Sequence, residues 1–143
     1  MPDTDTTSLQ LTTAERLEIH ELAARYGIVI DDRDWDGLAT VFTQDALFVT
    51  TGFGPGRDQR IEGLAALRAY MAASRHPVAH HVTNVMVGAD ATGVTLRSKI
   101  VGTLPKARAG SADYRDRLRL TPDGWRIAER VVTLRRADRP DEI

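Results

Sequence analysis

Residues 79–135, AHHVTNVMVGADATGVTLRSKIVGTLPKARAGSADYRDRLRLTPDGWRIAERVVTLR, decide the fold of this 143-residue chain. β-Branched and aromatic residues recur along the stretch, and glycine, proline and aspartate gather at short intervals between them. The pattern predicts four strands, over 79–88, 93–104, 112–120 and 125–135. The turns between them are too short for a crossover helix, so consecutive strands should pair antiparallel.

Two of these strands show how the sheet divides solvent from core. In 112–120 the arginines at 115, 117 and 119 share one face, which should point to solvent. Tyr114, Leu118 and Leu120 share the other face with Asp116, an unusual place for a carboxylate. In 125–135 the apolar residues change face, which predicts a strand buried on both faces along part of its length.

The chain before the strands is mostly helical. Thr12 and Glu15 have the spacing of a capping box, and apolar residues then recur at helical spacing to about residue 33. Ala24, Gly27 and Ile28 fill the sides that the main apolar stripe leaves open, which predicts a helix buried on more than one side. After it we expect a short helix over 36–42, a strand over 46–50, a glycine-rich turn over 51–60 and a helix over 64–74 that ends before Pro77.

Helices followed by strands predict an α+β fold. A long, curved antiparallel sheet wrapped around the long N-terminal helix encloses a cone, and its apolar interior suits a small molecule. The length allows one core, so we expect a single domain over 12–137, with a disordered tail at 1–11 and a second tail at 138–143.

Composition excludes several classes of function. The chain has no cysteine, which rules out disulfides, thiolate zinc sites and cysteine nucleophiles. Neither a secretory signal nor a membrane-spanning apolar run is evident, so we expect a cytoplasmic protein without a membrane partner. The net charge is −1, and the arginines of the basic C-terminal part alternate with acids without a pattern of stacking aromatics. Nucleic acid is therefore not an expected partner.

Histidines are the first candidates for chemistry. His20 and His76 are interpreted as surface residues. His80 and His81 open the strand 79–88 and must point to opposite faces, and the pattern leaves open which of them points inward. An inward histidine is a good general base, provided that an acid fixes its tautomer. No third ligand lies at metal spacing, so no metal site is expected.

The run DDRDWD, residues 31–36, supplies the candidate acids. Asp34 or Asp36 should cap the following short helix, and Asp32 should be solvated. Asp31 follows the apolar part of the first helix directly, so it is the candidate for a pocket acid. Tyr26 lies on the apolar stripe, where it is either a core aromatic or a hydrogen-bond donor to substrate.

Five short motifs extend these observations into a resemblance: Y-x4-D-x-x-D-W at Tyr26–Trp35, F-T-x-D-A at Phe42–Ala46, H-H-V-T-N at His80–Asn84, Y-x-D-x-L at Tyr114–Leu118 and D-G-W-x-I at Asp123–Ile127. In this order and spacing the chain resembles the SnoaL-like branch of the NTF2-like superfamily over about residues 12–136. The resemblance implies the cone described above, closed by two further helices, and a homodimer or homotrimer.

The resemblance also implies site residues. Dehydratases and a dehydrochlorinase of the superfamily share a histidine–aspartate dyad, which matches His80 and Asp31. The bile acid 7α-dehydratase has a tyrosine five residues before its aspartate, which matches Tyr26. Scytalone dehydratase uses a second histidine on a later strand, and this chain has no histidine after His81. The substrates of those enzymes are therefore not implied.

The leading hypothesis is a cofactor-independent lyase or isomerase, of dehydratase or cyclase type, that acts on a small apolar molecule with a carbonyl or hydroxyl group. His80 would remove a proton from carbon, Asp31 would orient His80, and Tyr26 would donate a hydrogen bond. The alternative is a non-catalytic module of the same fold that binds a small molecule or assembles an oligomer. The expected substrate-binding residues are Asn84, Trp35, Phe48, Phe53, Met71, Met86, Tyr114 and Asp116.

Overall fold

The computed structural model describes residues 9–135. Apart from residues 9–11, the tails predicted at 1–11 and 138–143 lie outside the described residues. No helix in the described range is long and apolar enough to cross a membrane. In chain order the elements are α1 (Thr13–Asp31), the 3-10 helix η1 (Asp36–Thr40), β1 (Phe42–Thr51), β2 (Arg60–Glu62), α2 (Leu64–Ala73), β3 (Ala79–Asp90), β4 (Gly93–Leu104), β5 (Arg108–Thr121) and β6 (Gly124–Arg135).

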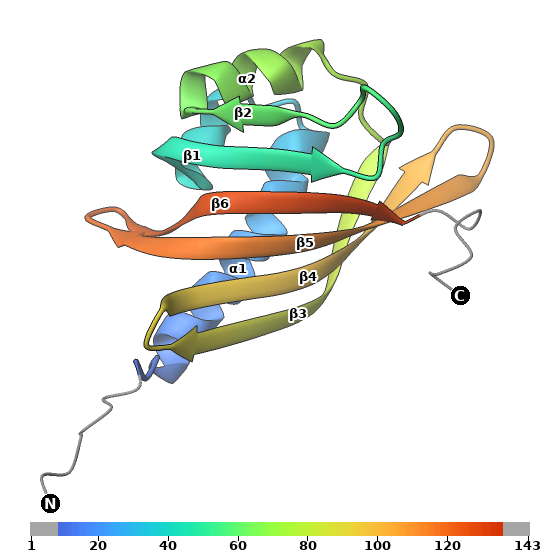
Figure 1. Ribbon diagram of the computed structural model, residues 1–143. Coiled ribbons are helices and arrows are strands. Elements are labelled where there is room, and N and C mark those ends of the chain that lie inside the picture. Colours follow the sequence, from blue (N-terminus) through green and yellow to red (C-terminus); the bar gives the residue numbers. More distant parts are fainter. Residues whose placement is uncertain (1–8, 136–143) are drawn as a thin grey trace, which may run out of the picture.

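The strands form one curved, six-stranded sheet in the order β2-β1-β6-β5-β4-β3. α1 lies across one face of this sheet, and α2 lies beyond the edge formed by β1 and β2 (Figure 1). The predicted α+β cone is confirmed, and β3 to β6 pair antiparallel as expected. The sheet is mixed, however, because β1 runs parallel to β6. These two strands are far apart in the chain, so no tight turn dictates their relative direction.

α1 begins and ends close to the predicted positions. The capping box is present: the Thr12 backbone N–H donates to Glu15 Oε2 at 2.8 Å, and the Glu15 N–H donates to Thr12 Oγ1 at 3.2 Å. The predicted burial on several sides is wrong: Gly27 is buried, but Ala24 is exposed and Ile28 is 62% exposed. The sheet covers only one side of the helix. That side carries the buried residues Ile19, Leu22, Ala23, Tyr26, Gly27, Val29 and Ile30.

The segments between α1 and β3 differ from expectation at two places. The short helix ends at Thr40, and Phe42 already belongs to β1. The Ile127 N–H donates to the Val41 carbonyl at 2.8 Å, so the chain joins the sheet earlier than its local pattern indicates. The glycine-rich turn leads into the short strand β2, which pairs with β1 and was not predicted. α2 ends within one residue of the predicted position.

A bulge explains the change of apolar face in β6. Leu118 pairs with Ile127, whereas Arg117 pairs with Glu129, so Ala128 is an extra residue in β6. Before the bulge Trp125 and Ile127 are buried, and after it Arg130 and Val132 are buried. The prediction of a strand buried on both faces is therefore wrong. On β5 the arginines at 115, 117 and 119 are exposed as expected, whereas Leu120, beside the β5–β6 turn, is 58% exposed.

Candidate active site

Asp31 and His80, which are far apart in the chain, are in direct contact. The His80 Nδ1 atom lies 2.7 Å from Asp31 Oδ1. The backbone N–H of His80 donates to both carboxylate oxygens of Asp31 at 3.0 Å. The contact joins the last residue of α1 to the second residue of β3. One carboxylate therefore fixes both the backbone and the imidazole of His80.

The position of Asp31 is electrostatically unfavourable on its own. The C-terminus of a helix carries partial negative charge, which destabilises a carboxylate there by roughly 0.3–1 kcal/mol. The backbone and ring N–H groups of His80 offset this cost because both can donate to the carboxylate. The acid at the end of α1 therefore depends on β3, and the two elements are locked together at this point.

The contact with Asp31 sets the tautomer of His80. An ionised carboxylate only accepts hydrogen bonds, so His80 Nδ1 carries the proton and Nε2 keeps a lone pair. The His80 side chain is 7% exposed and that of Asp31 is 25% exposed. His81 is exposed on the opposite face of the strand. Of the adjacent pair, His80 is thus the histidine that points into the fold.

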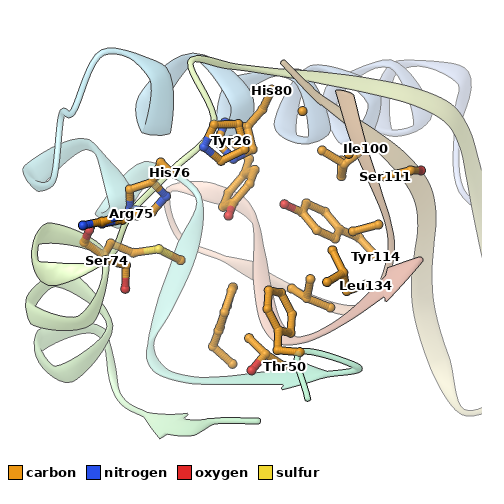
Figure 2. A pocket seen from close by; sticks show the side chains of 18 of the residues that line it. Tyr26, Thr50, Ser74, Arg75, His76, His80, Ile100, Ser111, Tyr114 and Leu134 are labelled. Atoms are coloured by element: carbon orange, nitrogen blue, oxygen red, sulfur yellow. The ribbon is translucent and has the colours of Figure 1, made fainter. Parts of the chain in front are cut away.

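His80 opens onto a cavity of about 300 Å³ between α1, α2 and the curved sheet. This is the size of a small-molecule site. Its walls are largely apolar, and its polar groups include Tyr26, His76 and His80 at one side (Figure 2). Within residues 9–135 no three histidine, aspartate or glutamate side chains converge as a metal site. The apolar wall is formed by Phe48, Phe53, Met71, Ile100, Leu104, Val132 and Leu134.

Two tyrosines bring phenol groups to the same cavity. Tyr26 comes from α1 and Tyr114 from β5, their ring centroids are 5.5 Å apart, and their hydroxyls point toward one another (Figure 2). The Tyr26 ring also lies 6.3 Å from the His80 ring. Burial raises the pKa of Tyr26, and the nearby positive charge of Arg130 offsets only part of this. Burial also raises the pKa of Tyr114, so both phenols remain protonated and able to donate at neutral pH.

A buried ion pair between Arg130 and Asp116 packs against the rings of the two tyrosines. Arg130 Nε and Nη2 donate to the two carboxylate oxygens of Asp116 at 2.8 Å and 2.7 Å, and both side chains are at most 1% exposed. The Arg130 Cζ atom lies 4.3 Å from the centroid of the Tyr26 ring and 4.1 Å from that of Tyr114. This is cation–π geometry on two rings. Although burial opposes it, the Asp116 carboxylate holds the pKa of Arg130 above its usual value.

The structure brings together some of the residues that the sequence singled out and separates others. Asp31 lies behind His80 and orients it. Trp35 packs against the ring of His76, 5.6 Å away, outside the cavity lining. Asn84 and Met86 are exposed and border a separate depression over β3, β4 and β5. Asp116 is buried in its ion pair with Arg130 and does not line the cavity. The cavity itself is lined by Tyr26, Phe48, Phe53, Met71, His80 and Tyr114.

Two residues of this region escaped the sequence analysis. His76, interpreted as a surface residue, is half-buried and lines the cavity, so that interpretation is wrong. Its position before Pro77, four residues from His80, gives no periodic signal. Arg130 was not singled out, because the bulge at Ala128 shifts the alternation of β6 and the sequence pattern does not show that Arg130 faces inward. The lone carboxylate of Asp116 on an apolar face was the available clue, since a buried acid requires a cationic partner.

The approach of α1 to β3 depends on Gly27. A Cβ at this position would lie 3.0 Å from the His80 carbonyl oxygen and 3.8 Å from the His80 Cβ. We expect Gly27→Val to lower the free energy of unfolding by about 1–3 kcal/mol, because it overpacks this contact. Urea unfolding measures the effect, and Ala24→Val on the exposed side of the same helix is the control. Equal losses for the two variants would contradict a tight α1–β3 contact.

A helix wrapped by a curved, unclosed sheet around an internal cavity defines the NTF2-like class of α+β cones. The sequence model of the SnoaL-like domain matches residues 12–131, so the chain belongs to the SnoaL-like family. It is 34% identical over 128 residues to the uncharacterized protein Rv2910c of Mycobacterium tuberculosis, a match that covers 84% of this chain and 85% of that protein.

Solved structures support the same assignment. A variant of Rv3472, a Mycobacterium tuberculosis protein of unknown function, superposes with a TM-score of 0.72 at 34% identity over 87% of this chain and 74% of that one. An NTF2-like protein with a cystatin-like fold from Novosphingobium aromaticivorans gives a TM-score of 0.72 at 27% identity, covering 90% of this chain and 86% of that one.

Proposed function

We propose that this protein is a cofactor-independent lyase or isomerase that removes a proton from a carbon atom of a small, largely apolar substrate. The 2.7 Å contact between His80 Nδ1 and Asp31 Oδ1, at the wall of an apolar cavity, carries the proposal. It leaves the lone pair of His80 Nε2 as the general base. The apolar surroundings disfavour the positive charge that His80 acquires when it takes the proton, so the base depends on the adjacent Asp31 carboxylate to offset that charge.

The other groups have complementary roles. Asp31 stabilises the imidazolium that forms when His80 takes the proton, because its carboxylate already accepts the Nδ1 hydrogen. Tyr26 donates a hydrogen bond to the oxygen on which negative charge develops, either a leaving hydroxyl or an enolate. The substrate carries such an oxygen next to the acidic carbon. Dehydration, double-bond isomerisation and aldol-type cyclisation all use this set of groups.

The probe 5-nitrobenzisoxazole tests the proposal without knowledge of the natural substrate. Removal of its ring C–H proton breaks the N–O bond and forms a nitrile and a coloured phenolate, so a base and a hydrogen-bond donor are all that it requires. We expect the wild-type protein to convert it faster than free imidazole at equal concentration. A protein that binds the probe but does not convert it would favour the non-catalytic module.

Asp31→Asn should lower kcat/KM for this probe about tenfold. The amide no longer offsets the charge of the imidazolium, which removes part of the 10²–10⁴-fold gain that acid–base catalysis supplies. The exposed neighbour Asp32 provides a matched control, and Asp32→Asn should leave kcat/KM unchanged. Initial rates of phenolate formation measure both variants. An Asp31→Asn variant with wild-type kcat/KM would contradict the role of the dyad.

A further inference from the structure

A second imidazole faces the same cavity. His76 lies in the connection between α2 and β3, lines the cavity, and has its ring centroid 6.2 Å from that of His80. Figure 2 shows the two rings on the same side of the cavity, with Arg75 farther out. The ring of Trp35 packs against His76 at 5.6 Å. The side chain therefore has a fixed place in the wall.

The hydrogen bond of His76 determines its tautomer. Its Nε2 atom lies 2.7 Å from the Met71 carbonyl oxygen near the end of α2. A carbonyl oxygen can only accept, so Nε2 carries the proton and Nδ1 keeps a lone pair. Burial lowers the pKa of His76, and the Met71 carbonyl only partly opposes this, so the neutral ring prevails at pH 7. His80 has the reverse arrangement, with its proton on Nδ1.

The lone pair of His76 is available to a ligand. Some side-chain polar atoms of the described residues are both sealed from solvent and without a hydrogen-bond partner, for example Thr43 Oγ1 and Ser98 Oγ. The free ring nitrogens of His76 and His80 are not in this group, and both residues line the cavity. Both imidazoles and the phenol of Tyr26 thus belong to the lining of one small cavity.

We propose that His76 Nδ1 accepts a hydrogen bond from a hydroxyl group of the ligand, so that the cavity selects hydroxylated molecules. The inference rests on the proposed function, in which His80 Nε2 takes the proton from carbon. A ligand with a hydroxyl for His76 and an oxygen acceptor for Tyr26 is then held at two points, with its acidic carbon toward His80. The substrate class is a small hydroxylated carbonyl compound, and His76 is a positioning residue.

Phenol and toluene, which are alike in shape, test this inference without turnover. The wild-type protein should bind phenol about tenfold more tightly than toluene, the difference expected for one hydrogen bond. In protein labelled with ¹⁵N in histidine, phenol should shift the Nδ1 resonance of His76 and toluene should not. The same spectrum should show His76 with its proton on Nε2. A proton on Nδ1, or a shift confined to His80, would overturn the proposal.

Two variants separate ligand recognition from a purely structural role. His76→Asn keeps a polar atom near Nδ1 but loses the bond to Met71, so it should retain part of the preference for phenol. His76→Gln can reach the Met71 carbonyl but loses the acceptor near Nδ1, so its preference should fall to nearly none. A structural role predicts the reverse order.

A third variant makes the two proposals independently testable. The preference for phenol should persist in His80→Ala, because the acceptor at His76 remains. If the preference disappears there, His80 is the acceptor and the inference about His76 fails, whatever the activity of the wild-type protein. If the preference persists but Asp31→Asn and His80→Ala keep wild-type turnover, only the proposed reaction fails.

Discussion

Replacing His80 with alanine is expected to lower kcat/KM for 5-nitrobenzisoxazole about 1,000-fold, within the range typical of a lost general base. His80 Nε2 provides the base, and its Nδ1 proton is held by Asp31 at 2.7 Å. The remaining activity would come from the apolar cavity and from the hydrogen bond donated by Tyr26. The loss should appear in kcat, because the base interacts with the probe mainly as the proton moves.

His81→Ala is the natural control for this prediction. His81 is the adjacent residue, has the same side chain and is exposed on the opposite face of β3. Its removal should leave kcat/KM within about twofold of wild type, since surface substitutions leave folding and the cavity largely unchanged. Circular dichroism should show that both variants are folded. Similar losses for the two variants would rule out His80 as the specific base.

Arg130→Met should lower the free energy of unfolding by about 3–5 kcal/mol, the cost of leaving a buried charge without its partner. The Asp116 side chain is fully buried, and the Arg130 guanidinium donates a hydrogen bond to each of its carboxylate oxygens. The substitution also removes the cation from the rings of Tyr26 and Tyr114. Small domains have only about 5–15 kcal/mol in total, so the variant will be marginally stable. Urea unfolding followed by tryptophan fluorescence measures the loss.

The double variant Arg130→Met/Asp116→Leu keeps this prediction testable even if the single variant does not fold. With both charges gone, the site becomes an apolar contact under the tyrosines, and such replacements are often neutral or stabilising. Arg130 Nη1 already lacks a partner within the described structure, so the native pair is incompletely satisfied. We expect the double variant to recover most of the lost stability. A double variant no more stable than Arg130→Met would contradict the ion-pair explanation.

Much of the fold could be predicted because its signals are local. The capping box at Thr12, the helical spacing that follows and the turns between β3 and β6 each act over a few residues. The parallel pairing of β1 with β6 and the short strand β2 could not be predicted in this way. They depend on contacts between distant segments, which the periodicity of one segment does not encode.

The candidate site follows the same rule: some of its residues could be predicted, whereas features that depend on contacts between distant segments could not. The resemblance pointed to Asp31 and His80, and the structure brings them into contact. Whether His80 or His81 points inward depends on which face of β3 meets α1, and adjacent residues cannot reveal that. Asn84 and Met86 were expected to bind substrate, and regular alternation along the strand would place them on the same face as His80. A bulge between Thr83 and Met86 breaks that alternation, and both residues lie outside the cavity.

The extra residue Ala128 changes which residues of β6 face the interior, from odd-numbered ones before it to even-numbered ones after it. Upstream of it, β6 presents Trp125 and Ile127 inward, and downstream it presents Arg130 and Val132. Without the bulge, regular alternation through Ala128 would turn Arg130 toward solvent and bring Glu129 and Val131 inside, whereas deletion of Ala128 itself would keep Arg130 and Val132 inward. The lining of the cone is therefore set by how β6 accommodates one extra residue, and not by the odd–even pattern of its sequence alone.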